Sequence, residues 1–331
     1  MHLHLYLARY TNVHLSAFDD AVSMIAGAAK ELGLSCSQGY SEGPGTNIVI
    51  GSNVMAEIGR SPPPGAILYT FEQHASGSHW ATPSQIKYLK GSSLWSYDPV
   101  VTRRLAGYGL YPRNVPVRYC AAWETMPKAE EDIDVAFFGS PSEYRTTILR
   151  QMRGYGLNVY SEKAYGQQRD AIYARAKVCL SLASHHTPVL QTLRIGYLLA
   201  NRRCVVSDPF QSPELYPEAS SLEVVDPSQV ADRCRELVAN PKARATIAER
   251  AYAAYSTSPF RDVLAAALRP PEKCVSPEEV AFASSVQGTR EIVVQTQNNK
   301  IPLSVLVFLH AQPFWKIVAQ SGDTLTLRKF P

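Results

Sequence analysis

The sequence contains no apolar run long enough to cross a membrane and no long block of like charge. Its most apolar stretch, residues 301–311, is about half of the ~20 residues that a membrane-spanning helix requires. The N-terminus has no basic segment followed by a long apolar stretch, so we expect no secretory signal. The 33 Lys and Arg residues exceed the 29 Asp and Glu residues by only four, which suits a polyanionic partner or an anionic membrane surface without requiring either. We therefore expect a cytoplasmic protein with no transmembrane segment, for which peripheral contact with a membrane stays open.

Cysteine is present, but never in the paired spacing that zinc sites use. The six cysteines form no C-x-x-C pair, so we expect neither a structural zinc site nor a redox motif. Cys179 and Cys204 lie within apolar, strand-like segments. Reduced, buried thiols are the expectation.

The composition is that of a globular protein. Of the 331 residues, 45% are hydrophobic and 19% are charged, which excludes a disordered or collagen-like chain. The length suits one large α/β fold or two compact domains.

Strand-like and helix-like segments alternate over residues 1–125. The pattern predicts a helix over residues 17–32 that ends at Gly33, whose lack of a Cβ suits a helix C-cap. Short apolar runs bounded by turn residues predict strands at residues 3–8, 47–50, 66–71, 93–97 and 115–119. A charged spacer at residues 128–132 indicates a domain boundary, so we expect a first domain over residues 1–125.

Residues 126–270 are expected to form a second domain with a parallel sheet. An apolar strand at residues 133–138 runs into Gly139, and Ser140, Pro141 and Glu143 together predict a helix that begins with a capping box at Ser140. Further strands and helices alternate at residues 167–176, 178–182, 188–200 and 204–207, followed by two amphipathic helices at 227–239 and 241–255. This alternation is typical of a doubly wound parallel sheet.

The tail, residues 271–331, has a different character. Four short runs with strand-like composition predict a β-rich extension at residues 291–297, 303–309, 314–320 and 324–329. The sequence suggests no role for it.

The strongest candidate for an anion site is the junction at Gly139. A buried strand that passes through a glycine into a helix leaves backbone N–H groups free at the positive end of the helix dipole, which suits a phosphate. Arg145, one turn into the helix, could add a charge-assisted contact. The alternative is that Ser140 and Glu143 only cap each other, so that the motif is structural.

Two further polar clusters follow predicted strands. Ser184-His185-His186-Thr187 precedes a helix at the carboxyl end of a parallel strand, where ligands bind in such sheets, although a solvated loop is the alternative. Glu72 and His74 follow the strand at 66–71 and are candidates for a general base, against an ordinary polar strand end.

Asp132 and Asp134 have the D-x-D spacing that metal-dependent sugar transferases use. They open a strand rather than close one, so we expect them to be structural.

From about Asn47 to Asp208 the order and spacing of the segments resembles bacterial and viral glycosyltransferases of the GT-B architecture, in which two Rossmann-like domains face each other across a cleft. The stretches that carry the resemblance are residues 47–51, 63–69 with Glu72 and Gln73, 94–98, 135–145, Gly166 with Arg169 and Asp170, 176–178, 194–201 and 205–207. The block at 194–201 is the most specific, because in the family this helix faces the nucleotide of an activated sugar. The tail beyond Pro271 lies outside the resemblance.

The resemblance implies roles for particular residues around a nucleotide-diphosphate sugar. Gly139, Ser140 and Arg145 would approach the diphosphate, and Tyr165 and Gly166 would lie near the base. His185, His186 and Thr187 would face the sugar and its phosphate. The residues with these implied donor-side roles are Gly139, Ser140, Arg145, Tyr165, Gly166, His185, His186, Thr187 and Gln191.

Gln191 stands where the family usually has a glutamate that accepts hydrogen bonds from both ribose hydroxyls. An amide can accept only through its oxygen. The identity of the nucleotide is therefore open at this position.

The function that the sequence supports is sugar transfer from a nucleotide-diphosphate donor, most simply a UDP-sugar, to a hydroxyl acceptor without a metal ion or other cofactor. Glu72, His14 or Asp19 is the candidate base in the first domain. The alternatives are a nucleotide-sugar-binding relative without activity and a nucleotide-sugar epimerase. A glycan, glycolipid or glycoprotein acceptor is favoured over a hydroxymethylated base in viral DNA, because the basic residues are scattered.

Overall fold

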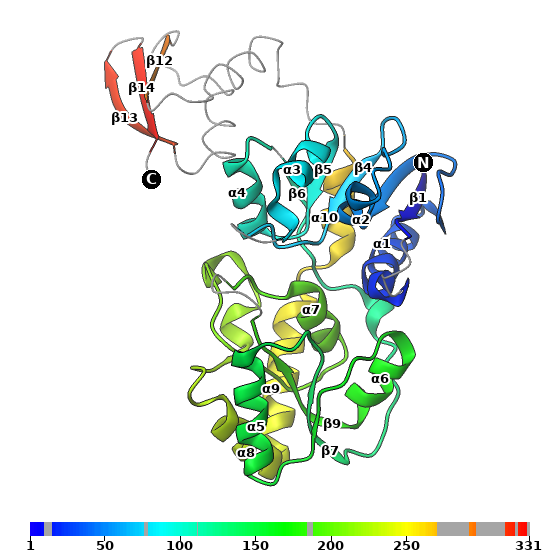
Figure 1. Ribbon diagram of the computed structural model, residues 1–331, viewed down its shortest axis with the longest axis vertical. Helices are drawn as coiled ribbons and strands as arrows, with labels where there is room; N and C mark the ends of the chain where they lie inside the picture. Colours follow the sequence, from blue (N-terminus) through cyan, green and yellow to red (C-terminus); the bar gives the residue numbers. More distant parts are fainter. Residues whose placement is uncertain are drawn as a thin grey trace.

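The computed structural model of the chain describes residues 1–9, 15–75, 79–110, 112–183, 188–269, 291–295, 315–321 and 324–329. Two α/β halves are stacked along the long axis of the molecule, and a small third sheet lies at the end of the first half (Figure 1). His14, His185, His186 and Thr187 lie outside the described residues.

The first half is built on a six-stranded parallel sheet with the order β2-β1-β3-β4-β5-β6. Its strands are β1 (His2–Leu7), β2 (Ser35–Gly39), β3 (Thr46–Ile50), β4 (Ile67–Thr70), β5 (Ser93–Ser96) and β6 (Arg113–Asn114). Its helices are α1 (Asp19–Glu31), α2 (Ser52–Glu57), α3 (Pro83–Leu89) and α4 (Pro99–Gly107).

Helix α1 shows why the sequence folds in this way. Its buried residues Ala21, Met24, Ile25, Ala28 and Ala29 recur at the spacing that places them on one face. The helix ends at Gly33, which has φ +67 and lets Leu34 N–H reach back to the carbonyl of Ala29, as in a Schellman motif. Leu32 is the C-cap, and the prediction that the helix stops at Gly33 is confirmed.

The second half is built on a five-stranded parallel sheet with the order β11-β10-β9-β7-β8. Its strands are β7 (Ile133–Phe137), β8 (Val159–Tyr160), β9 (Ala176–Ser181), β10 (Val205–Ser207) and β11 (Glu223–Val224). Its helices are α5 (Glu143–Gly154), α6 (Gly166–Arg175), α7 (Thr192–Ala200), α8 (Val230–Ala239) and α9 (Pro241–Ser256).

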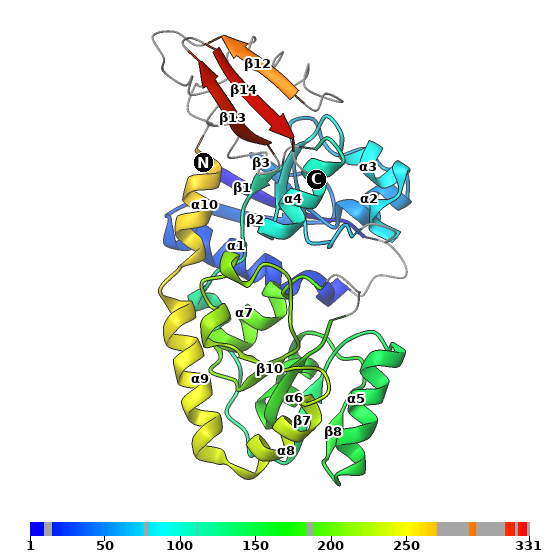
Figure 2. The ribbon, with the colours of Figure 1, turned by 90° about the vertical axis from the view of Figure 1, so that its left-hand side faces the viewer.

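The two halves share a continuous apolar core and a returning helix. Trp123 and Tyr197 belong to the same buried cluster as the strands of the first sheet. After α9, helix α10 (Phe260–Leu268) runs back to the first half and packs against α1 (Figure 2). Short 3₁₀ helices occur at Leu15–Phe18, His79–Ala81, Ala121–Trp123, Pro213–Leu215 and Ala219–Ser221.

The third sheet is antiparallel, with the order β12-β14-β13. Its strands are β12 (Glu291–Gln295), β13 (Trp315–Ser321) and β14 (Thr324–Lys329). Three of the four strands expected in the tail are thus present, and the fourth, at 303–309, lies outside the described residues.

The predicted fold class, two parallel α/β sheets flanked by helices with a β-rich C-terminal extension, is confirmed. The strand predicted at residues 115–119 is wrong, because β6 covers only Arg113–Asn114. The helix predicted from residue 188 begins only at Thr192. Cys179 and Cys204 are buried as free thiols, as expected.

Candidate functional site

A cavity of about 640 Å³ lies between the two halves. It is reached by residues that directly follow strands of both sheets: Phe71 follows β4, Tyr97 follows β5, and Phe138 follows β7. The carboxyl ends of both parallel sheets therefore meet at one space, which is where open α/β sheets bind ligands. The lining residues are Ser16, Ala17, Asp20, Phe71, Glu72, Gln73, Trp80 and Tyr97 from the first half, and Phe138, Gly139, Ser140, Pro141, Ser142, Arg145, Lys163, Ala164, Tyr165, Arg169, Gln191, Leu193 and Arg194 from the second.

The turn from β7 into α5 opens onto this cavity, although its cap differs from the prediction. Ser142, not Ser140, is the N-cap, because its hydroxyl accepts the Arg145 N–H at 3.3 Å. Helix α5 consequently begins at Glu143, and Pro141 precedes it. Since the first-turn N–H groups of an α-helix have no intrahelical acceptors, this end presents donors and positive potential to the cavity.

Arg145 is buried, and its hydrogen bonds hold the loop that follows β9 in place. Its guanidinium donates to the carbonyls of Ser140 (2.7 Å), Leu182 (2.6 Å) and Ala183 (3.0 Å). A Cβ on Gly139 would lie 3.2 Å from Arg145 Nη1 and 2.7 Å from the Phe137 ring, so the glycine makes room for this reach. Main-chain carbonyls thus accept hydrogen bonds from three of the five guanidinium N–H groups. Burial, with Arg194 nearby, lowers the pKa of Arg145 to about 10, so that it stays charged at neutral pH.

Gln191 and Arg194 form the adjoining wall at the start of α7. The Gln191 amide donates to the carbonyl of Leu182 at 2.9 Å, and its oxygen accepts from Arg194 Nη1. Burial lowers the pKa of Arg194, and the charge of Arg169 lowers it further. In the part of the chain that the structure describes, neither Arg145 nor Arg194 forms an ion pair with a carboxylate. The positive potential of these two neighbouring guanidinium groups favours binding of an anion.

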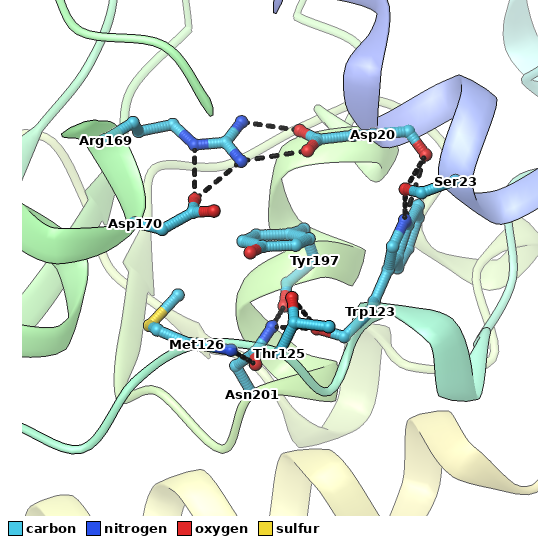
Figure 3. Close-up of polar contacts among 9 residues, drawn as sticks. All are labelled: Asp20, Ser23, Trp123, Thr125, Met126, Arg169, Asp170, Tyr197 and Asn201. Carbon is cyan, nitrogen blue, oxygen red and sulfur yellow. Dashed lines mark hydrogen bonds and ion pairs between the residues drawn. The ribbon is translucent and has the colours of Figure 1, made fainter. Parts of the chain in front are cut away.

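Arg169 is also cationic, but its charge is already matched. It forms two hydrogen bonds to Asp20 of α1, at 2.6 and 2.9 Å, and a further contact with Asp170 at 2.8 Å (Figure 3). The ring of Tyr197 lies 4.7 Å from the guanidinium carbon, and Trp123 Nε1 donates to the Asp20 carbonyl at 2.9 Å. This cluster joins α1 of the first half to α6 and α7 of the second.

Asp19, the candidate base on α1, does not line the cavity; its neighbour Asp20 does. Asp19 lies instead beside Gly166, where a Cβ would come within 3.4 Å of its Oδ2. Gly166 has φ +51, a conformation that favours glycine, and it opens α6 directly after Tyr165, which lines the cavity.

Glu72 lines the cavity from the first half, and Arg145 and Arg194 line it from the second. Asn53, from α2, donates to Glu72 Oε1 at 3.1 Å. His74, the other base candidate beside it, is 2% exposed and both of its ring nitrogens are hydrogen-bonded within the protein. It is therefore not available to a substrate, and the interpretation of His74 as a base is wrong.

The structure brings Glu72, Gly139, Ser140, Arg145, Tyr165 and Gln191 together around one cavity. Sequence reasoning gave no role to Arg194 or to the Asp20–Arg169 pair. The signal for Arg194 was its place in the 194–201 block. Asp20, in contrast, lies 149 residues from Arg169 in the sequence, and no local pattern connects the two.

The D-x-D residues are structural, as expected. Asp132 pairs with Arg175 at 2.5 Å and Asp134 pairs with Lys177 at 2.7 Å, and neither lines the cavity. Within the described ranges, no cluster of three or more His, Cys, Asp or Glu side chains could hold a metal ion.

Residues 118–259 match the family model described as Glycosyl transferase-like. The match contains β7 to α9, including the β7–α5 turn, Arg145 and Arg194. The resemblance to glycosyltransferases that the sequence suggested is confirmed for this region. No curated protein matches the sequence.

Several solved structures are similar in fold. One is the DNA-modifying enzyme β-glucosyltransferase, determined in the presence and absence of its substrate uridine diphosphoglucose (TM-score 0.46, 11% identity, covering 81% of this chain and 99% of that chain). Another is an α1,3-fucosyltransferase with GDP-fucose (TM-score 0.41, 11% identity, covering 80% and 88%). A third is a putative UDP-N-acetylglucosamine 2-epimerase from Listeria monocytogenes (TM-score 0.43, 10% identity, covering 86% and 96%).

None of the described helices combines the length and the apolar character needed to cross a bilayer.

Proposed function

We propose that the protein transfers a sugar from a nucleotide-diphosphate donor, with UDP as the favoured nucleotide, to a hydroxyl acceptor. The observation that carries this proposal is the pair Arg145 and Arg194, which face one cavity beside the N-terminus of α5 with no carboxylate ion pair within the described residues. A bound diphosphate supplies the negative charge that matches these two cations. The family match over residues 118–259 supports the same reading.

The reaction uses the two walls for different tasks. The acceptor oxygen attacks the anomeric carbon while the bond from that carbon to the diphosphate oxygen breaks. Glu72 takes the acceptor proton from the first-half wall. The departing diphosphate gains negative charge, which Arg145, Arg194 and the first-turn N–H groups of α5 stabilise. These groups supply positive charge without a metal ion, and no cofactor beyond the donor substrate is proposed.

Gln191 takes a structural part in this site. Both ends of its amide are engaged, with the Leu182 carbonyl and with Arg194, so it fixes the direction of the Arg194 side chain. Tyr165 is 37% exposed at the cavity and offers a ring for the nucleotide base. The proposed contact of His185, His186 and Thr187 with the sugar–phosphate side concerns residues outside the described ranges.

A glycan, glycolipid or glycoprotein acceptor is favoured over DNA. The two arginine doublets that could serve a nucleic acid are largely engaged within the protein. Arg104 donates to the Gln73 carbonyl and to Gln211, Arg202 lies beside Glu124 and Glu249, and Arg203 pairs with Glu131. Few arginines of these doublets are left to neutralise backbone phosphates.

A thermal-shift screen of UDP-glucose, UDP-N-acetylglucosamine and GDP-mannose tests the proposal. A donor at 100 times its Kd should raise the free energy of unfolding by about 2.7 kcal/mol. Arg194→Gln should remove most of that shift. The matched control is Arg150→Gln, which removes an exposed charge from α5 and should keep the shift.

Assays of the same three donors for release of nucleotide diphosphate and for conversion of the donor sugar distinguish the rival functions. Donor binding with no release of nucleotide diphosphate indicates a binding protein, and conversion of the donor sugar without an acceptor indicates an epimerase. Absence of any shift for all three donors, or an equal shift in the wild type and Arg194→Gln, contradicts the diphosphate assignment.

A further inference from the structure

The chain leaves β4 through a short turn that carries Glu72 to the cavity and ends in a strained, buried histidine. Thr70 is the last residue of the strand and is 2% exposed. His74, four residues later, is also 2% exposed and has φ +44, in the left-handed region that residues other than glycine rarely adopt. A buried imidazole in such a backbone persists only where its surroundings compensate for both features.

The hydrogen bonds of His74 fix its tautomer. Its Nδ1 lies 2.8 Å from the carbonyl oxygen of Trp80, which can only accept, so Nδ1 carries the proton. Its Nε2 lies 2.8 Å from Thr70 Oγ1 and, in the neutral ring, must accept the hydroxyl proton. Burial lowers the pKa of His74 to about 4, with a further lowering by Arg104, so the ring is neutral near pH 7.

This arrangement reaches the backbone of Glu72. With its proton donated to His74, Thr70 Oγ1 keeps lone pairs that face the Glu72 N–H at 3.4 Å. The side chain is held separately, since Asn53 donates to Glu72 Oε1 and is itself held by Gln85 Nε2, which donates to the Asn53 carbonyl at 3.2 Å. Main chain and carboxylate of Glu72 are thus held by two different sets of contacts.

The other end of His74 reaches a second residue of the cavity wall. Trp80 lines the cavity, and its carbonyl is the acceptor for His74 Nδ1. One buried ring therefore connects the segment that carries Glu72 with the segment that carries Trp80.

We propose that His74 is a positioning residue that, through Thr70, sets the place of Glu72 at the cavity and at the same time ties Trp80 to the same wall. This role rests on the proposed function, in which Glu72 takes the acceptor proton. His74 itself neither gives nor takes a proton in the reaction.

Thr70 offers the cleanest perturbation, because valine has the same shape and lacks the hydroxyl. Thr70→Val removes the link between His74 Nε2 and the Glu72 N–H, whereas Thr70→Ser keeps it. Thr246→Val is the matched control, because it removes an exposed hydroxyl on α9 that bonds only within its own helix. His74→Asn tolerates the left-handed backbone but is too short to reach both Trp80 and Thr70.

The readout is release of nucleotide diphosphate from UDP-glucose, with UDP-N-acetylglucosamine and GDP-mannose run in parallel and water as the acceptor. Displacement of a base by about 1 Å can cost on the order of a hundredfold. We expect Thr70→Val and His74→Asn to lower kcat roughly ten- to a hundredfold with little change in donor KM, and Thr70→Ser to recover most of the loss. Thr246→Val should match the wild type.

A second measurement does not depend on activity. Imidazole ¹⁵N shifts of the full chain should show His74 as the neutral Nδ1–H form from pH 8 down to pH 6. A protonated His74, or the Nε2–H tautomer, overturns the proposal.

The two ways of failing are distinct. Turnover in the wild type that is lost in Glu72→Gln but unchanged in Thr70→Val overturns the role of His74 alone. A rise in donor KM with unchanged kcat in Thr70→Val also overturns it. A wild type that neither binds nor turns over any of the donors overturns the proposed function, and the role of His74 with it.

Discussion

Breaking the ion pair between Asp20 and Arg169 should destabilise the protein, because one charge is then left buried without its partner. The pair connects α1 to α6 across 149 residues of sequence and forms two hydrogen bonds at 2.6 and 2.9 Å. The side chains are only 12% and 14% exposed, so solvent screens the pair little. Replacing Arg169 by Met keeps much of the apolar stem over Tyr197 and removes the charge.

The size of the effect follows from what each substitution leaves behind. Removing one partner of a buried pair costs about 3–5 kcal/mol, because the other charge is left uncompensated. Arg169→Met leaves both Asp20 and Asp170 without their cation, so we expect a loss of about 3 kcal/mol. Asp20→Asn should cost less, about 1–2 kcal/mol, because Arg169 keeps its contact with Asp170.

Urea unfolding of the two single variants and the double variant measures the coupling directly. Trp123 is a suitable fluorescent reporter, because its indole donates to the Asp20 carbonyl and to Ser23. We expect a coupling free energy of about 1–2 kcal/mol. The matched control is the Asp132–Arg175 pair, which has similar distances but is 52% and 44% exposed and should show no measurable coupling. A coupling below about 0.5 kcal/mol for Asp20 and Arg169 would refute the reasoning.

Two further predictions concern buried positions. Burial raises the pKa of Asp98, which accepts from Tyr216 of the second half, from 3.8 to about 6. The folded state therefore binds this proton more tightly than the unfolded state, and its stabilising effect is lost as pH rises from about 4 to 6, by about 3 kcal/mol in total. In urea titrations at several pH values, Asp98→Asn should lack this loss; an unchanged profile contradicts the assignment. Gly196→Ala should destabilise the protein by about 1–3 kcal/mol, because its Cβ would lie 2.2 Å from Tyr255 Oη, whereas Gly154→Ala, with nothing within 4 Å, should be neutral or slightly stabilising. Equal melting temperatures for the two alanine variants would contradict this.

Much of the fold could be predicted from the sequence, because buried parallel strands appear as short apolar runs between turn residues. That pattern located β3, β4, β5, β7 and β9. It missed β2, whose residues Ser35–Gly39 are mostly polar because the strand lies at the edge of the sheet. It also placed a strand at 115–119, directly after β6, where Val115 and Val117 still donate to the carbonyls of Ser96 and Tyr97 although the strand has ended.

The candidate site was predictable where it follows a general rule and not where it depends on distant partners. Because carboxyl ends of parallel strands meet, Glu72, Gly139 and Arg145 could be expected at one edge. The sequence offers a serine at both 140 and 142, and only the backbone of the structure shows that Ser142 is the N-cap. Asp19 was the predicted residue, but Asp20 lines the cavity. Which of the two does so depends on the rotation of α1 about its axis, and the ion pair between Asp20 and Arg169 of the second half fixes that rotation.

Titration calorimetry of UDP and of uridine into the wild type and Arg194→Gln tests the central claim most directly. If the β7–α5 turn with Arg145 and Arg194 holds a diphosphate, UDP should bind the wild type at one site, uridine should bind far more weakly, and Arg194→Gln should weaken UDP by about tenfold or more, corresponding to about 1.4 kcal/mol. Equal affinities for UDP and uridine, or UDP binding that Arg194→Gln leaves unchanged, would contradict it.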